Sequence, residues 1–143
     1  MDYYGTGRTN YFKVKDVEAF KKWVNSFGGQ LITKTTRVKG KEVETPELVG
    51  IIVDGIPDMK RADAEDDAEL VEFDFYEELK SHLRNGQVAV YMESGAEGHR
   101  YVTGFAVAMC PGKEDVGINI DEIYKLAARK FRVSKTRITD VAY

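Results

Sequence analysis

Two β-rich segments on either side of a short turn constrain the fold of this chain more than any other feature. Residues 87–93 alternate between two sets of apolar side chains, and residues 99–110 are rich in Val, Tyr, Thr and Phe. The connection at 94–98 carries two glycines, and connections of this length join antiparallel strands. The sequence therefore predicts a β-hairpin, which the turn at 111–112 ends.

Three further stretches place apolar residues at helical spacing, and each follows a side chain that can cap a helix. The caps are Asp16, Asp74 and Asn119, whose side-chain oxygens can accept hydrogen bonds from free backbone N–H groups. Gly28 and Gly86 favour helix ends after the first two stretches. The three apolar stripes are Val17, Phe20, Trp23, Val24 and Phe27; Tyr76, Leu79 and Leu83; and Ile120, Ile123, Tyr124, Ala127 and Phe131.

The remaining β-rich runs complete the predicted order of elements. We predict one α+β domain over residues 1–143, in the order β-α-β-β-α-β-β-α-β, with a mainly antiparallel sheet and helices on one face. Residues 1–7 are expected to form a disordered tail, and residues 56–69 an acidic loop. The strands outside the first hairpin are expected at 11–14, 30–36, 48–53 and 137–143.

Composition predicts an intracellular globular protein. The 143 residues are 43% hydrophobic and 31% charged. No apolar run reaches the roughly 18–20 residues of a membrane span, and the N-terminus lacks the features of a secretory signal. Cys110 is the only cysteine, so no internal disulfide can form, which fits a reducing compartment. We therefore expect a cytoplasmic protein with no membrane partner.

The net charge of −3 conceals a strong asymmetry along the chain. Residues 1–41 carry a net charge of +6, residues 42–78 one of −12, and residues 79–143 one of +3. A folded surface that is acidic on one side and basic on another is compatible with this pattern. Whether the three blocks separate in space depends on the fold.

No catalytic or metal-binding motif accompanies these elements. Cys110 ends a predicted strand, where its ordinary role is that of a small buried hydrophobe. The acidic run at 63–67 lacks the glycine and terminal Glu of a calcium-binding loop. We expect no metal and no cofactor. One enzymatic alternative stays open, a small site near the hairpin turn, which requires its polar side chains to converge. Those side chains are Glu93, Glu97, His99 and Arg100.

The leading hypothesis is a non-enzymatic module that docks onto a basic surface of a partner protein. Carboxylates of the 42–78 block alternate with apolar residues, which suits such docking or imitation of a nucleic-acid backbone. A solvated loop that leads into an amphipathic helix would produce the same pattern. The predicted contact consists of Asp63, Glu65, Asp66, Asp67, Glu69 and Glu72, with Phe75 as an aromatic anchor.

A second hypothesis is nucleic-acid binding by the segment 125–137, which is rich in basic residues and has no acidic one. Tyr124 and Phe131 could stack on bases. Cations near a helix C-terminus also complement the helix dipole, which explains part of the pattern without a ligand. The basic residues are Lys125, Arg129, Lys130, Arg132, Lys135 and Arg137. A homodimer through an unpaired strand edge is a further open alternative.

Several segments resemble a group of small bacterial proteins from phages, plasmids and other mobile elements. The likeness lies in residues 10–16, 87–90, 95–97 and 100–107, together with Ala19, Phe20 and Trp23. These are core and turn residues with no catalytic signature, so the resemblance carries over no functional residue. It implies a mobile-element accessory protein that meets host defence or replication machinery, such as an inhibitor of a nuclease or a CRISPR effector.

Overall fold

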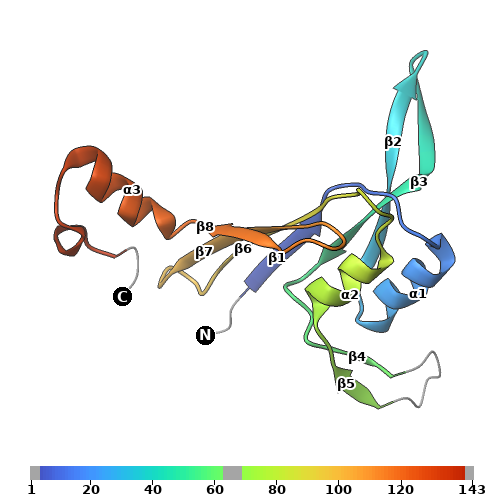
Figure 1. The fold of residues 1–143 in the computed structure, drawn as a ribbon, viewed down its shortest axis with the longest axis horizontal. Helices are drawn as coiled ribbons and strands as arrows, with labels where there is room; N and C mark the ends of the chain where they lie inside the picture. Colours follow the sequence, from blue (N-terminus) through green and yellow to red (C-terminus); the bar gives the residue numbers. More distant parts are fainter. Residues whose placement is uncertain (1–3, 63–68, 141–143) are drawn as a thin grey trace.

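Six strands form one antiparallel sheet in a computed structural model that describes residues 4–62 and 69–140 (Figure 1). The strands lie in the order β2-β3-β1-β6-β7-β8, and each neighbouring pair is antiparallel. Their bounds are β1 (Tyr4–Thr9), β2 (Gln30–Val38), β3 (Lys41–Val53), β6 (Ala89–Ala96), β7 (Val102–Met109) and β8 (Val116–Asn119). The predicted α+β class with an antiparallel sheet is confirmed.

β1 joins the two halves of this sheet. It pairs with β3 through Gly7 and Arg8, and with β6 along its whole length. Gly7 is required at this position, because a Cβ there would lie 2.0 Å from the hydroxyl oxygen of Tyr91. The tyrosine ring on β6 therefore packs across the backbone of β1.

Two helices, α1 (Val17–Ser26) and α2 (Phe75–His82), pack on one face of the sheet (Figure 1). Both begin at the predicted caps. Asp16 Oδ1 accepts a hydrogen bond from the backbone N–H of Ala19 at 3.1 Å, and Asp74 Oδ1 accepts one from that of Glu77 at 3.2 Å. After α1, Gly28 adopts a φ of +78°, where glycine has no Cβ to strain.

The core between these helices and the sheet is built mainly from aromatic rings. Trp23 of α1 stacks on Phe75 of α2 with ring centroids 5.8 Å apart, and Phe75 meets Tyr91 of β6 edge-on at 5.4 Å. The indole N–H of Trp23 donates to Glu78 Oε1 at 2.9 Å, so the polar atom of this ring is satisfied. His82 packs against the same indole, and burial lowers the pKa of His82.

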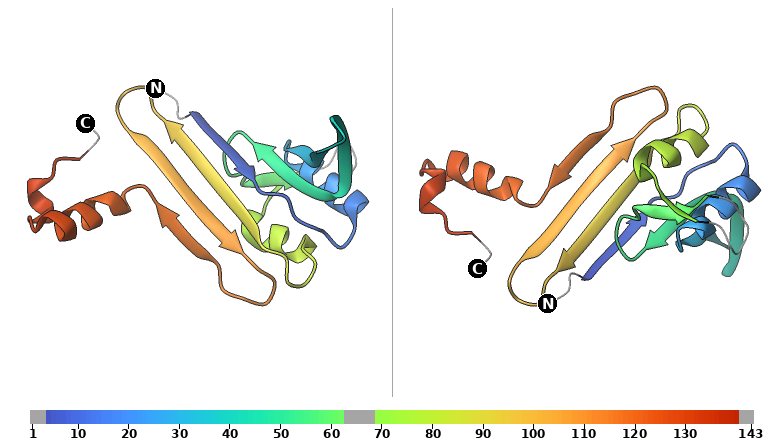
Figure 2. Two further views of the ribbon diagram at one scale, coloured as in Figure 1. Left: turned by 90° about the horizontal axis from the view of Figure 1, so that it is seen from above. Right: turned by 90° about the horizontal axis from the view of Figure 1, so that it is seen from below.

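The C-terminal segment leaves the sheet instead of packing on it. α3 (Glu122–Phe131) extends beyond the end of β8, and no residue of this helix is buried. Figure 2 shows the same separation from two other directions. A short 3₁₀ helix, η1 (Lys135–Arg137), follows α3, and we call residues 122–137 the C-terminal arm. The prediction that helices cover one face of the sheet therefore holds for α1 and α2, whereas α3 does not pack on the sheet.

A two-stranded hairpin, β4 (Met59–Arg61) and β5 (Leu70–Glu72), precedes α2. Its ladder runs from Met59 opposite Glu72 to Arg61 opposite Leu70. The predicted loop at 56–69 is therefore wrong for the three residues of β4. Residues 63–68 lie outside the part of the chain that the structure describes.

The first predicted strand, at 11–14, is also wrong. Phe12 and Val14 are buried and make one isolated bridge each, because the chain here passes from β1 to α1. Alternation at these positions indicates burial of every second side chain without ladder pairing. β1 lies at Tyr4–Thr9 instead, so the predicted disorder of residues 1–7 is wrong for residues 4–7. Residues 1–3 are outside the described range.

The C-terminal end differs from the prediction as well. The sequence does not predict β8, which pairs with β7 along its length. Asn119 is therefore a strand residue, and α3 begins after Asp121. The strand predicted at 137–143 is wrong for residues 137–140, because Ser134 caps a 3₁₀ turn and no strand follows among the described residues. Residues 141–143 are not described.

Truncation of Leu79 tests the position of the core. This side chain of α2 is 0% exposed, so Leu79→Ala should lower the free energy of unfolding by about 2–5 kcal/mol, because it removes buried apolar atoms and leaves a cavity. Leu70→Ala, at a side chain 61% exposed, should change it by less than about 0.5 kcal/mol. Urea unfolding followed by the fluorescence of Trp23 measures both values. Equal decreases in the two variants would show that Leu79 is not a core residue.

Candidate functional site

An open hollow with an acidic rim lies where the connection between β3 and β4 meets the connection between β5 and α2. Its volume is about 490 Å³. Three of its lining residues carry carboxylates, and the other five are apolar or aromatic. We call it the acidic hollow, and it is lined by Ile56, Pro57, Asp58, Glu72, Phe73, Asp74, Phe75 and Tyr76.

Backbone hydrogen bonds bring these two connections together. Met59 of β4 pairs with Glu72 of β5, and the N–H of Phe73 donates to the carbonyl oxygen of Asp58 at 3.2 Å. Asp74 is fixed at the same place as the N-cap of α2. Three carboxylates that come from two separate segments of the chain therefore line one hollow.

The aromatic side of the hollow is held rigidly by the core. The ring of Phe73 stacks on Phe27 with centroids 5.6 Å apart and meets Trp23 edge-on at 6.4 Å. The Nζ atom of Lys60 lies 5.2 Å from the centre of the Phe73 ring and forms an ion pair with Glu78. The ring therefore already takes part in a cation–π contact, the kind of contact an incoming Lys or Arg side chain would make.

The rim carboxylates are available to a ligand. Neither Asp58 nor Glu72 forms an ion pair with any residue that the structure describes. The ammonium group of Lys60, one position along β4 from Met59, is engaged by Glu78. The negative charge at the rim is therefore not neutralised by neighbouring side chains of the described chain.

Tyr76 lines the hollow and is partly buried. Burial raises the pKa of Tyr76 to about 12, with further contributions from the carboxylates of Glu93, Asp115 and Asp74. Its hydroxyl group is neutral at physiological pH, as that of an ordinary tyrosine is, and can donate a hydrogen bond.

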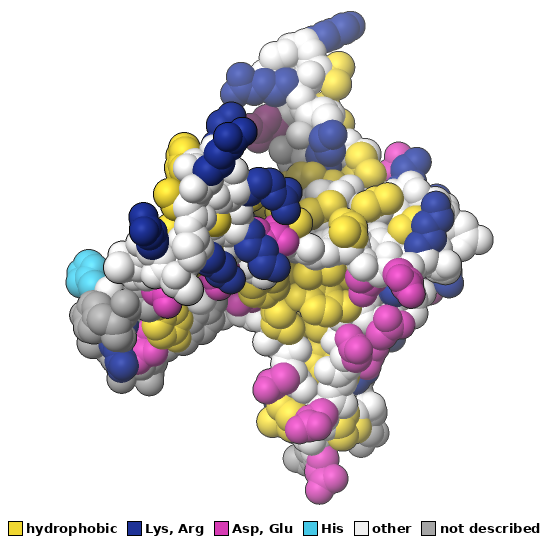
Figure 3. Space-filling view, turned by 60° about the vertical axis from the view of Figure 1, so that its left-hand side comes forward, with side chains coloured by type: hydrophobic (Ala, Val, Ile, Leu, Met, Phe, Trp, Pro, Cys, Tyr) yellow, Lys and Arg dark blue, Asp and Glu magenta, His cyan; other side chains and the backbone are white. Residues whose placement is uncertain are grey.

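The structure describes part of the predicted acidic contact. Glu69 and Glu72 are exposed at β5, and Glu72 lines the hollow. Figure 3 shows acidic side chains gathered over the hairpin that projects at the bottom of the view. Asp58 and Asp74, which are not among the predicted contact residues, join this surface. The predicted residues Asp63, Glu65, Asp66 and Asp67 lie outside the described residues.

The prediction that Phe75 is the aromatic anchor of the contact is wrong. Its side chain is 2% exposed because the ring stacks on Trp23 inside the core. The exposed apolar residues of the hairpin are Met59 and Leu70, which are 36% and 61% exposed. Leu70 and Glu72 are two positions apart on β5, so their side chains lie on the same face of the strand. A prediction of β5 as a strand would have placed this apolar side chain beside the carboxylate.

The charge blocks of the sequence are only partly separate in space. In the β2–β3 hairpin, Arg37 lies opposite Glu42, so the basic first block and the acidic second block are neighbours there. The third block behaves differently. All six predicted nucleic-acid-binding residues are exposed on the C-terminal arm. Lys125 and Arg129 are one helical turn apart.

The side chains of the enzymatic alternative do not converge. Glu93 is 8% exposed and accepts a hydrogen bond from the hydroxyl group of Tyr91 at 2.5 Å on the strand β6. Glu97 lies four residues further on, about 13 Å along an extended chain, and pairs with Arg100 at 3.4 Å. His99 is exposed in the turn. No shared pocket is formed by these four residues.

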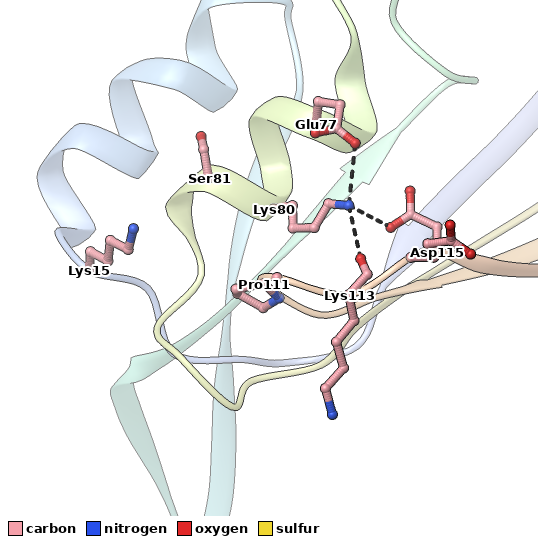
Figure 4. Close-up of a pocket in the computed structure, with 9 residues that line it drawn as sticks. Lys15, Glu77, Lys80, Ser81, Pro111, Lys113 and Asp115 are labelled. Carbon is pink, nitrogen blue, oxygen red and sulfur yellow. Dashed lines mark hydrogen bonds and ion pairs between the residues drawn. The ribbon is translucent and has the colours of Figure 1, made fainter.

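A second hollow, of about 660 Å³, lies between α2 and the turn from β7 to β8 (Figure 4). Lys80 occupies its centre, with Nζ 2.9 Å from Asp115 Oδ1, 3.3 Å from Glu77 Oε1 and 3.4 Å from the carbonyl oxygen of Lys113. The hydrogen bond to Asp115 raises the pKa of Lys80. All three ammonium donors are used, so Lys80 serves to hold the turn against α2.

The described residues contain no further sign of a cofactor. Among residues 4–62 and 69–140, no three His, Cys, Asp or Glu side chains form a group that could hold a metal ion. None of the described helices is long and apolar enough to cross a membrane. Comparison of the chain with protein-family models, curated proteins and solved structures found no match. The surface of the chain is therefore the basis for inferring function.

Titration of Tyr76 tests the burial of its hydroxyl group beside the hollow. The unfolded chain releases this phenolic proton near pH 10.0, whereas the folded chain holds it to about pH 12. The free energy of unfolding should therefore fall as the pH rises between these two values. Tyr76→Phe should show a smaller fall, and urea unfolding at about pH 9 and about pH 11 measures the difference. An equal fall in both proteins would contradict the raised pKa.

Proposed function

We propose that this protein is a non-enzymatic binding module that docks onto a basic surface of a partner protein through the acidic hollow. The observation that carries the proposal is the pair of rim carboxylates, Asp58 and Glu72, which have no cation partner among the described residues. A partner that brings Lys or Arg to the rim would supply the missing charge, and the partial exclusion of water would strengthen the attraction.

The lining of the hollow favours a long basic side chain over a simple cation. The aromatic side chains of Phe73 and Tyr76 line the hollow, where they can contact the methylene groups of Lys or Arg. The neutral hydroxyl of Tyr76 adds a hydrogen-bond donor for a backbone carbonyl group of the partner. Aromatic residues are enriched in the central contacts of protein interfaces, and polar groups lie mainly at the rim.

Exposed apolar side chains extend this surface beyond the hollow. Leu70 and Met59 project from the β4–β5 hairpin, and Ile56, 40% exposed, lies at its base. Burial of such side chains under a partner would contribute about 25 cal/mol per Å² of apolar area removed from water. The proposed interface therefore combines charge for orientation with apolar area for affinity.

The resemblance to proteins of mobile elements directs the choice of partner. Nucleases and CRISPR effectors bind nucleic acid through basic grooves, and a carboxylate-rich surface has the complementary charge. We infer a counter-defence role in which the acidic hollow occupies such a groove.

Neutralisation of the rim tests the docking site. Asp58→Asn with Glu72→Gln removes two charges with little change in shape, and Asp74 is left unchanged because it caps α2. We expect roughly tenfold weaker binding of an oligo-arginine peptide, measured by fluorescence anisotropy. The same pair of proteins, used as baits in nuclease-treated lysate of the source cells, should differ in the partner that they retain.

The control variant carries the same change of charge at another place. Glu42→Gln with Glu44→Gln alters two exposed carboxylates of β3 in the β2–β3 hairpin, away from the hollow. It should weaken peptide binding by less than about twofold. If both variants weaken binding equally, net charge and not the hollow determines affinity, and the proposed site is wrong.

A second candidate function, nucleic-acid binding, is favoured by one observation. The basic residues of 125–137 all lie exposed on an arm that projects from the domain, which leaves them accessible to a long polyanion. On α3, Lys125 and Arg129 lie on the side of the helix opposite Ile123 and Ala127. α3 therefore carries Lys125 and Arg129 on the side opposite its apolar stripe, whereas Lys130 lies within the stripe.

Salt dependence tests this second function. Arg129→Gln with Arg132→Gln should weaken binding of a short DNA duplex and lower the slope of log K against log salt by roughly 0.9 for each phosphate that is no longer neutralised. Lys21→Gln with Lys22→Gln, at exposed positions of α1, makes the same change of charge elsewhere. Identical slopes for wild type and the arm variant would exclude the arm as the nucleic-acid-binding element.

A further inference from the structure

The face of the sheet opposite α1 and α2 is apolar and uncovered at its β8 end. Residues that pair directly in an antiparallel ladder point to the same side, and one such row crosses four strands: Arg8 of β1, Met92 of β6, Ala106 of β7 and Ile118 of β8. Met92 is 59% exposed and Ile118 is 62% exposed. We call this surface the outer face.

The outer face is hollowed. A depression of about 560 Å³ follows the row, and its lining is mainly apolar. Gly104 and Ile120 complete it, and the side chain of Ile120 lies against Gly104, where a Cβ would come within 3.2 Å. A depression of this size can receive one or more large side chains.

The same chain carries a helix whose apolar stripe is exposed and has no partner among the described residues. On α3, Ile123, Leu126 and Phe131 are 59%, 56% and 70% exposed. They lie on one side of the helix together with Ala127 and Lys130, whereas Lys125 and Arg129 lie on the other. Helices of this kind are normally stabilised by burying the apolar stripe against another element.

Hydrogen bonds hold α3 away from the outer face of its own chain. The N–H of Ile120 donates to the carbonyl oxygen of Gly104 at 2.9 Å, which continues the β7–β8 ladder to the start of the helix. The N–H of Ile123 then donates to the carbonyl oxygen of Ile120 at 3.1 Å. Because the connection is this short and bonded on both sides, α3 continues beyond the end of β8 and does not turn back (Figure 1).

We propose that a second copy of this chain covers the outer face, with α3 of each copy lying on the outer face of the other. In the part of the chain that the structure describes, one face is uncovered and one helix is unpartnered, so a reciprocal exchange satisfies both in a closed dimer with two-fold symmetry. α3 is about 15 Å long, shorter than the eight-residue strands β6 and β7 at about 27 Å, so the helix fits within the face.

Charge complementarity supports a second copy as the occupant. The exposed charge beside the depression is the guanidinium group of Arg8, and α3 begins with the carboxylates of Asp121 and Glu122. The basic face of α3 would stay exposed in the dimer, because Lys125 and Arg129 point away from the apolar stripe. A lipid surface would be expected to bind this basic face together with the stripe, which makes vesicle binding a separate outcome of the test.

The test measures molar mass and association of the full chain by light scattering and sedimentation velocity. Wild type should form a species of twice the 16.2 kDa chain mass. A helix variant, Leu126→Glu with Phe131→Glu, and a face variant, Met92→Glu with Ile118→Glu, should each weaken the dimer by on the order of 100-fold or more, because they would bury charge. The control, Val38→Glu with Val43→Glu, changes two exposed apolar residues of the β2–β3 hairpin and should leave the dimer unchanged.

Mixing distinguishes exchange from other modes of pairing. The helix variant keeps an intact face and the face variant keeps an intact helix, so an equimolar mixture should form a heterodimer through one of the two contacts. Absence of that heterodimer, with loss of both homodimers, would indicate pairing of like surfaces and overturn the exchange. A wild type that stays monomeric overturns the proposal too, and loss of binding to anionic vesicles in the helix variant would then assign the stripe to a lipid surface.

Far-UV circular dichroism of each variant confirms that the substitutions at these exposed positions leave the fold intact.

Discussion

The pairing of β1 with both β3 and β6 is the constraint on which the rest of the structure depends. Without it the β2–β3 hairpin and the β6–β7–β8 meander would be separate sheets, and a two-stranded hairpin is only marginally stable by itself. Gly7 permits this pairing because the ring of Tyr91 takes the space that a Cβ would fill. The segment that builds the acidic hollow runs from the end of β3 to α2, so its position is also set by the junction at β1.

The core is concentrated around one part of the sheet, and this explains where surfaces are left open. Trp23, Phe75 and Tyr91 join α1, α2 and β6 in one aromatic cluster. Two helices of ten and eight residues cover a patch roughly 20 Å wide, whereas six strands span about 29 Å and present two faces. Apolar residues of β8 and of the outer face therefore have no helix of their own chain to cover them.

The parts of the fold that sequence predicted are those encoded by local signals. Asp16 and Asp74 cap helices by contacts three residues away, and the two hairpins depend on short turns. β1 was missed because Gly5 and Gly7 carry no β propensity, and its pairing uses the backbone. Phe75 was misplaced because an aromatic residue after an acidic segment can face either the core or solvent, and tertiary packing on Trp23 decides between them. The acidic character of the candidate site was visible in the sequence, whereas the contribution of Asp58 required the β4–β5 ladder.

The two proposed surfaces are compatible because they lie on opposite sides of the sheet. The acidic hollow is built beside α2, on the face that the helices cover, and the exchange of α3 would use the outer face. A dimer formed in this way would present two acidic hollows at a fixed separation. A partner with two basic sites, or a partner that is itself dimeric, would then gain from effective concentration without any additional interface. The same geometry would leave the basic face of each α3 exposed, so that nucleic acid held by the partner could contact the arm while the hollow contacts the protein.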